Sequence, residues 1–412
     1  MSPALTSLSR RHKPDYWLVI LAASLMSLGL VVVYSISPGL AATQHVSQGY
    51  FITKQLIDVA LGVGAFIFAM QMPAKWWRQS AKPLLVVAAV ASLLVLLMPL
   101  DAVYQAHRWL RLGGFSFQVA ELIKLALLVF TAGFLTKRWS QGKLADSRLT
   151  LYPLLAILAV VGVVVAKFQS DLGSAGVMVV MLGIMAYVAG IPLKRVLQLA
   201  VIVGALFVLA IASSGYRRER LNTFFHPGSD CQASGYQACQ AIIAVGSGGL
   251  VGQGLGSGVQ AYGYLPQASN DSIFAIMAEK FGFIGSLAIV ALYWALIARI
   301  KKVAERTIDP FMRLLTIGVL AWFSTQMIIN VGAMLGLLPL KGITLPFISQ
   351  GGTSLIFLTA ALGIVFHVSR YTSYSPREPS LDNNEIDTPN HSFDRRWQRR
   401  PSDSYSVARP RP

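Results

Sequence analysis

Long apolar runs recur along most of this chain, and a lipid bilayer is the environment that suits them. A membrane-spanning helix needs about 20 mostly apolar residues, and it satisfies its own backbone hydrogen bonds, as lipid demands. Only 13% of the residues are charged and the mean hydropathy is +0.57, which is unusual for a soluble domain. The sequence therefore predicts an all-α integral membrane protein with about ten transmembrane helices. The candidate spans lie near residues 16–36, 51–71, 83–100, 119–136, 151–167, 174–191, 196–213, 272–298, 313–337 and 351–369.

The first apolar run has two interpretations. Arg10, Arg11 and Lys13 precede it, as basic residues precede the core of a secretory signal peptide. However, its apolar stretch of roughly 20 residues is longer than a signal core, which has about 7 to 15. We therefore expect a retained membrane span.

The distribution of lysine and arginine predicts the orientation of the helices. With the N-terminus inside, the inner segments before the C-terminal tail carry 16 of these residues, and the outer segments carry 7. Basic residues gather on cytoplasmic loops, so both termini are expected in the cytoplasm. The same rule explains the net charge of +17 without a nucleic-acid partner, because the chain has no soluble basic domain.

Four outer segments follow from this topology, namely 101–118, 168–173, 214–271 and 338–350. The third, between the seventh and eighth helices, is a large extracytoplasmic loop, and loops of that size are usually functional. Its glycines ("VGSGGLVGQGLGSG") complete no phosphate-binding motif, so re-entrant backbone or turns are expected. Its cysteines, Cys231 and Cys239, would face an oxidising space, and a disulfide between them is predicted.

The last part of the chain has a different composition. Residues 372–412 are rich in Pro, Ser, Asn and charge and poor in aliphatic residues, which is typical of disorder. Within them "RRWQRR" would suit anionic lipid or a partner, although a solvated tail is the simpler interpretation. The chain thus divides into a cytoplasmic segment 1–15, a transmembrane domain 16–371 and a disordered cytoplasmic tail 372–412.

Polar residues at the outer ends of the spans are candidates for a functional site, because lipid makes them costly. Arg108 and Gln118 precede the fourth span, which carries Glu121 and Lys124 near its outer end. Glu121 and Lys124 are three residues apart, on one face of a helix. They are either a self-neutralising pair that stabilises the bundle or part of the lining of a polar cleft. Their spacing does not decide between these interpretations.

Two aspartates stand where a helix N-cap would lie. Asp171 precedes the sixth span and Asp271 the eighth, and local sequence favours capping for both. Glu279 follows Asp271 by eight residues, roughly 12 Å along a helix, so the two form no close carboxylate pair. Arg220 and Lys341 add outer cations. Cations beside carboxylates suit a lipid-linked phosphate ligand, although interfacial snorkelling would explain some of them.

Four segments, in this order and spacing, resemble one known family. They are "RWLRLGGFSFQVAELIKL", "QSDLGS", "GYQACQAIIAVGSGGLVGQGLGSGVQAYGYLPQASNDSIFAIMAEKFGFIG" and "LPLKGITLPFISQGGTSLI". The match covers nearly all of residues 15–372, and the chain resembles the SEDS proteins, the membrane peptidoglycan polymerases typified by FtsW and RodA. The chain resembles the division branch (FtsW) more than the elongation branch (RodA) in three features. These are Lys341 before "GITLPFIS", the total length of the chain and its C-terminal tail.

The resemblance implies a peptidoglycan glycosyltransferase that polymerises lipid II into β-1,4-linked glycan strands during septal wall synthesis. Lipid II is a disaccharide-pentapeptide on undecaprenyl pyrophosphate. Its sugar is α-linked and the product is β-linked, so a single inverting displacement with one general base suits the reaction. Asp271 matches the essential acid of the family.

The resemblance also suggests residues that hold the substrate. Cations would offset the charge that grows on the pyrophosphate, and Glu121 is expected to orient Lys124. Lys280 stands where the family has a second Glu, and it is expected to pair with Glu279. The substrate-binding candidates are Gln118, Glu121, Lys124, Arg108, Arg220 and Lys341.

The implied partners are lipid II, membrane lipids, a class B penicillin-binding protein transpeptidase and other divisome membrane proteins, at the septum of a bacterial inner (plasma) membrane. Two other functions fit the same features: a lipid II flippase, which needs no base, and a scaffold that only activates the transpeptidase. No metal-ligand spacing occurs. No cofactor is required, although a divalent cation, Mg²⁺ or Mn²⁺, bridging Asp271 and pyrophosphate is an open alternative.

Overall fold

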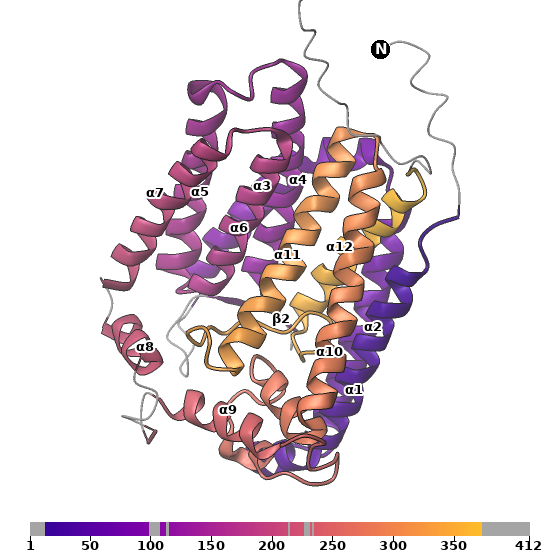
Figure 1. Cartoon of the computed structure of the whole chain (residues 1–412), viewed down its shortest axis with the longest axis vertical. Coiled ribbons are helices and arrows are strands. Elements are labelled where there is room, and N and C mark those ends of the chain that lie inside the picture. The colour runs from indigo at the N-terminus through magenta and orange to yellow at the C-terminus, as the bar shows by residue number, and fades with distance from the viewer. Residues whose placement is uncertain are drawn as a thin grey trace, which may run out of the picture. The chain divides into compact units, whose positions relative to one another are not determined.

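The structure, a computed structural model, describes residues 13–98, 108–112, 115–212, 215–225, 231–232 and 235–372. Each predicted span corresponds to a helix within the described residues (Figure 1). The predicted tail, apart from Thr372, lies outside the described residues. The helices of the spans are α1 (Trp17–Gln44), α2 (Tyr50–Gln71), α3 (Ala74–Leu97), α4 (Val119–Ser140), α5 (Tyr152–Gly162), α6 (Leu172–Ala189), α7 (Leu193–Ala212), α10 (Ile273–Arg306), α11 (Pro310–Met334) and α12 (Thr353–Ser369). In the fifth span α5 is flanked by π-helical turns, η2 (Ser147–Leu151) and η3 (Val163–Phe168).

The length and composition of these helices confirm the predicted fold class. Within the described part of the chain, eight helical runs are long and apolar enough to cross a membrane. α12 falls just short with 17 residues, and α7 includes side chains outside the described part. The protein is therefore an all-α, multi-pass membrane protein.

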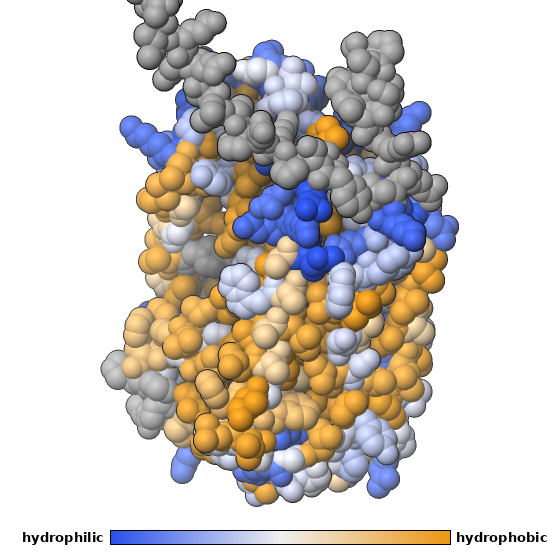
Figure 2. Space-filling view, turned by 45° about the vertical axis from the view of Figure 1, so that its right-hand side comes forward, coloured by the Kyte–Doolittle hydropathy of each residue, from blue (hydrophilic) through white to orange (hydrophobic). Residues whose placement is uncertain are grey.

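Two helices form the centre of the bundle. In their most apolar windows, 78% of α4 and 72% of α11 is buried, against 17% of α3. α11 packs against α4, α6, α10 and α12, and α2 packs along α12. The peripheral helices turn apolar side chains such as Leu93, 62% exposed, toward their surroundings. Figure 2 shows the apolar surface that results on one face, which suits lipid rather than water.

A short hairpin stands before α4. β1 (Trp109–Leu112) pairs antiparallel with β2 (Phe115–Gln118), so that Trp109 lies opposite Gln118. The apolar-run pattern predicts only an outer loop here, because two four-residue strands are too short to leave a clear periodic signal. The hairpin places Gln118 directly before the helix that carries Glu121 and Lys124.

α10 extends beyond its predicted span at one end and is interrupted near the other. It continues to Arg306 rather than ending near residue 298, because basic residues in its last turns are good helix formers. In that region Arg299 Nη2 lies 2.8 Å from Asp15 Oδ1. Near its start the helix is broken at Gly282, whose φ of 66° and ψ of −165° glycine adopts readily and other residues do not.

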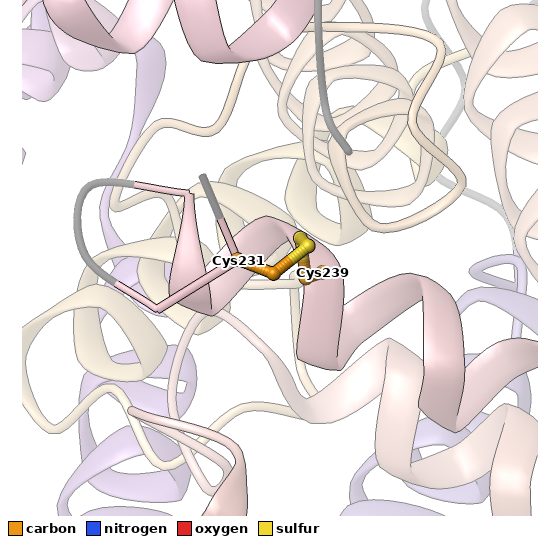
Figure 3. The surroundings of a disulfide bond; sticks show 2 residues. All are labelled: Cys231 and Cys239. Atoms are coloured by element: carbon orange, nitrogen blue, oxygen red, sulfur yellow. A yellow bond between two sulfur atoms is a disulfide. The ribbon is translucent and has the colours of Figure 1, made fainter. Parts of the chain in front are cut away.

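The long segment between α7 and α10 contains ordered elements. They are α8 (Gly215–Phe225), α9 (Tyr236–Ser247) and the π-helical turn η4 (Gln260–Tyr264). Cys231 and Cys239 form the predicted disulfide beside the start of α9, with Cα atoms 5.6 Å apart (Figure 3). The bond ties the residues before α9 to its first turn.

We expect both cysteines to resist alkylation until a reductant is added. The measurement is the intact mass of the purified protein after iodoacetamide treatment, with and without reductant. Cys231→Ser provides the control, because it leaves Cys239 without its bonding partner and open to one label. Two labels on the unreduced wild-type protein would contradict the disulfide.

Candidate active site

The hairpin before α4 is tied to the start of α6. Arg108 donates from Nε to the carbonyl of Gln169 at 2.8 Å and from Nη2 to the carbonyl of Ser170 at 2.5 Å. Gln118 donates from Nε2 to Asp171 Oδ2 at 3.2 Å. Two of the predicted substrate-binding residues therefore meet at the N-terminal end of α6.

Asp171 is the N-cap of α6, as its position predicts. Its Oδ1 accepts the backbone N–H of Ser174 at 2.9 Å, and its other oxygen accepts from Gln118. The residue is buried. With both oxygens engaged in holding a helix end and a hairpin, Asp171 has a supporting role in this structure.

Asp271 is not an N-cap, which corrects the prediction from local sequence. α10 begins at Ile273, and Ser272 precedes it as the cap residue. The main-chain carbonyl of Asp271 accepts from Asn330 Nδ2 at 2.7 Å, and the same amide nitrogen donates to the Ile343 carbonyl at 2.7 Å. Asp271 itself is half-buried. Contacts to its backbone, made from α11, fix its place.

The two residues before Asp271 are held by the segment that precedes α12. Ser349 Oγ donates to the carbonyl of Asn270 at 2.6 Å. The backbone N–H of Gln350 donates to the carbonyl of Ser269 at 2.9 Å. Two segments that are about 80 residues apart in the chain are thus joined directly by hydrogen bonds at the site.

Lys341 lies beside the segments of both aspartates. A Cβ atom placed on Gly173, two residues after Asp171, would lie 3.2 Å from Lys341 Cβ. A Cβ atom placed on Gly342 would lie 3.6 Å from Asp271 Oδ2. Lys341 is half-buried. The structure therefore brings the predicted base and a predicted cation to adjacent positions.

Glu121 and Lys124 form a buried ion pair with Nζ and Oε1 2.7 Å apart. Only 3% of Glu121 and 1% of Lys124 is exposed. Lys124 Nζ also donates to Gln326 Oε1 at 3.2 Å and lies 5.1 Å from the centre of the Trp322 ring. Of the two interpretations of the sequence, the structure agrees with the first, in which Glu121 and Lys124 neutralise each other inside the bundle. A direct contact with substrate stays a prediction.

Gln326 is a site residue that the sequence interpretation missed. Its Nε2 donates to the carbonyl and to Oγ1 of Thr344, at 3.0 and 3.2 Å. It therefore links Lys124 to the segment that carries Lys341. Gln326 and Asn330 are four residues apart on one face of an apolar helix, and that spacing of polar residues is the signal that could have identified them.

The structure gives no contacts for two predicted features, the Arg220 side chain and a divalent-cation site. Arg220 belongs to α8, but its side chain is outside the described part of the chain. Across the described ranges, no three His, Cys, Asp or Glu side chains gather into a group that could hold a metal ion. The described residues therefore offer no set of metal ligands around Asp271 for the alternative in which a divalent cation binds there.

Comparisons with known proteins agree with one another. The family model for FtsW, RodA and SpoVE, described as "Cell cycle protein", matches residues 16–374. The stage V sporulation protein E of Bacillus subtilis is 35% identical over 367 residues, which are 89% of this chain and 100% of that protein. A probable peptidoglycan glycosyltransferase FtsW of Geobacter metallireducens is 34% identical over 371 residues, 90% of this chain and 98% of that protein.

Solved structures share the fold over most of both chains. One belongs to work described as "Structural coordination of polymerization and crosslinking by a peptidoglycan synthase complex", with a TM-score of 0.71, 27% identity and coverage of 87% of this chain and 98% of the other. The rod shape determining protein RodA of Thermus thermophilus gives a TM-score of 0.64 at 26% identity, covering 87% and 97%.

Proposed function

This chain belongs to the FtsW/RodA/SpoVE family of cell cycle proteins, and we propose that it is a peptidoglycan glycosyltransferase of cell division. It polymerises lipid II into β-1,4-linked glycan strands. Relatives that match along nearly their whole length are named as probable peptidoglycan glycosyltransferases FtsW. The structurally similar synthase complex coordinates polymerization with crosslinking.

The reaction is a single displacement. The 4-hydroxyl of the acceptor sugar attacks the anomeric carbon of the donor, and the bond from that carbon to the pyrophosphate oxygen breaks. The linkage changes from α to β as undecaprenyl pyrophosphate leaves. Asp271 acts as the general base and takes the proton of the attacking hydroxyl.

The position of Asp271 is the observation that carries this assignment. Its backbone is fixed from α11, the residue as a whole is half-buried, and Gly342 next to Lys341 lies against its carboxylate. A base needs a fixed position with access to substrate, and a nearby cation would offset the charge that develops on the pyrophosphate. Arg108 retains N–H donors after its two bonds to carbonyls, so it and Arg220 are proposed for further phosphate contacts.

The remaining substrate-site candidates support this arrangement through their neighbours. Gln118 connects the hairpin to Asp171. Lys124 is paired with Glu121 and is connected to the segment of Lys341 through Gln326. In this structure Lys124 is too deeply buried to touch lipid II directly. An opening of the buried pair would be required for direct contact.

We extend the proposal to location and partners. A class B penicillin-binding protein transpeptidase is the partner class that a crosslinking synthase complex suggests, together with other divisome membrane proteins. The lysine and arginine distribution supports a bacterial inner membrane protein with both termini in the cytoplasm. The similarity to FtsW supports the proposal that the protein acts at the division septum.

Reconstitution tests this function against its alternatives. Purified protein, alone and with its partner transpeptidase, is given fluorescent lipid II in detergent and in vesicles. We expect glycan polymer that lysozyme digests. Transport of lipid II across vesicles without polymer would favour a flippase, and neither polymer nor transport would favour a scaffold.

A further inference from the structure

The break in α10 is filled by backbone from the glycine-rich loop that follows α9. Beyond Gly282, the N–H groups of Phe283 and Ile284 donate to the carbonyls of Gly249 and Leu250, at 2.8 and 3.1 Å. Helix ends leave such donors without partners in their own helix. The loop therefore completes the hydrogen bonding of a membrane helix that glycine interrupts.

The same loop also bonds to the other side of the break. The N–H groups of Gln253 and Gly254 donate to the carbonyls of Glu279 and Lys280, each at 3.0 Å. The approach is very close, because a Cβ atom on Gly252 would lie 2.2 Å from the Lys280 carbonyl oxygen. Only glycine permits the two backbones to meet in this way.

The Glu279 side chain extends this contact along the loop. The residue is fully buried, with an exposed fraction of 0%. Its Oε1 accepts the backbone N–H groups of Val259 and Gln260, at 3.1 and 3.3 Å. Burial of a carboxylate is costly unless it is hydrogen-bonded, and here the compensating donors come from the loop just where η4 begins.

The Lys280 side chain binds a neighbouring stretch of the same loop. Its Nζ donates to the carbonyls of Leu255 and Ser257, at 2.8 and 3.2 Å. Within the described part of the chain it forms no ion pair with Glu279, so the pairing expected from sequence is wrong. Adjacent residues of the helix instead bind successive parts of the loop, one as acceptor and one as donor.

These contacts act on the piece of helix that begins two residues after Asp271. The half of α10 before Gly282 starts at Ile273 and ends beside Glu279 and Lys280. At the start of this half, Ser272 Oγ donates to the carbonyl of Pro266 at 2.9 Å. The loop 249–260 thus binds the end of the half-helix that follows Asp271, and Pro266, in the segment between η4 and Asp271, binds its start.

We infer that Glu279 and Lys280 are positioning residues, which clamp the loop 249–260 onto the first half of α10 and so fix the place of Asp271. This inference rests on the proposed function, because it assigns these residues to the polymerisation reaction. Neither side chain needs to touch lipid II. Since a shift of about 1 Å in a reacting group can cost about 10²-fold in rate, loosening the clamp is expected to lower kcat.

The test compares substitutions that keep or remove the clamp. Glu279→Ala and Lys280→Met are expected to lower kcat by about 10²-fold, with a much smaller change in KM. Glu279→Gln keeps an amide oxygen for Val259 and Gln260, so its kcat is expected within about fivefold of wild type. In this variant the amide NH₂ group replaces Oε2. That oxygen is buried and has no hydrogen-bond partner among the described residues, so the substitution removes no existing hydrogen bond.

Hydrogen exchange supplies a readout that does not depend on activity. In the intact protein, amides of residues 249–260 are expected to exchange faster in Glu279→Ala and Lys280→Met, but not in Glu279→Gln. Arg78→Ala is the matched control, since it removes an exposed ion pair with Asp309 and should change neither readout.

Two results would overturn the inference. One is faster exchange of the loop in Glu279→Ala with wild-type kcat, because the clamp would then not position Asp271. The other is a Glu279→Gln variant as inactive as Glu279→Ala with a protected loop, because the charge itself would then act in the reaction. Absence of polymer from the wild-type protein would refute the proposed function instead, and exchange would still show whether the clamp exists.

Discussion

Replacement of Asp271 by Asn is expected to reduce lipid II polymerisation by about 10² to 10⁴-fold, the usual contribution of a general base. Asn has nearly the same shape, and the backbone contacts that hold this residue, from Asn330 and through Asn270, do not involve the carboxylate. The variant should therefore fold normally and still bind lipid II. The measurement is glycan chain formation by purified protein with its partner, beside a direct lipid II binding assay.

Asp171→Asn is the control for this experiment. Asp171 is also an aspartate just before a span, but it caps α6 and holds Gln118. Asn remains a good N-cap, so this variant should keep most of its activity. If Asp271→Asn polymerises lipid II at close to the wild-type rate, another group must remove the proton.

Replacement of Lys124 by Met is expected to destabilise the protein by about 3 to 5 kcal/mol. The change leaves the carboxylate of Glu121 buried without its cation, and removal of one partner from a buried pair typically has that cost. It also removes a donor to Gln326. The measurement is the shift of the unfolding midpoint of the purified protein in detergent.

The double variant Glu121→Gln/Lys124→Met separates a structural role from a substrate role. It removes both charges, so most of the lost stability is expected to return. A double variant no more stable than Lys124→Met alone would show that the two residues are not a compensated pair. A Lys124→Met protein of wild-type stability that fails to bind lipid II would instead favour direct contact with the substrate.

The helices, the cap of α6 and the disulfide can be predicted from local sequence, because each depends on residues close together in the chain. In lipid, each apolar run must satisfy its own backbone, so runs of about 20 residues predict the helices. The Asp171 cap is also predictable, because its donor belongs to the first turn of the helix it precedes. The Cys231–Cys239 bond is equally local, since the cysteines are only eight positions apart in the chain.

The partners of other residues lie in distant parts of the chain, so the folded structure is needed to identify them. Asp271 resembles a cap in sequence, yet it is held from α11, 59 residues away. Glu279 and Lys280 are neighbours of opposite charge, yet each bonds to loop backbone because the break at Gly282 brings the loop 249–260 against them. The amino-acid pattern alone indicates which segments are membrane helices and which polar residues lie at their ends. Which backbone groups those residues satisfy depended on the packing of helices and loops, because a buried polar group bonds to whatever the fold brings within reach.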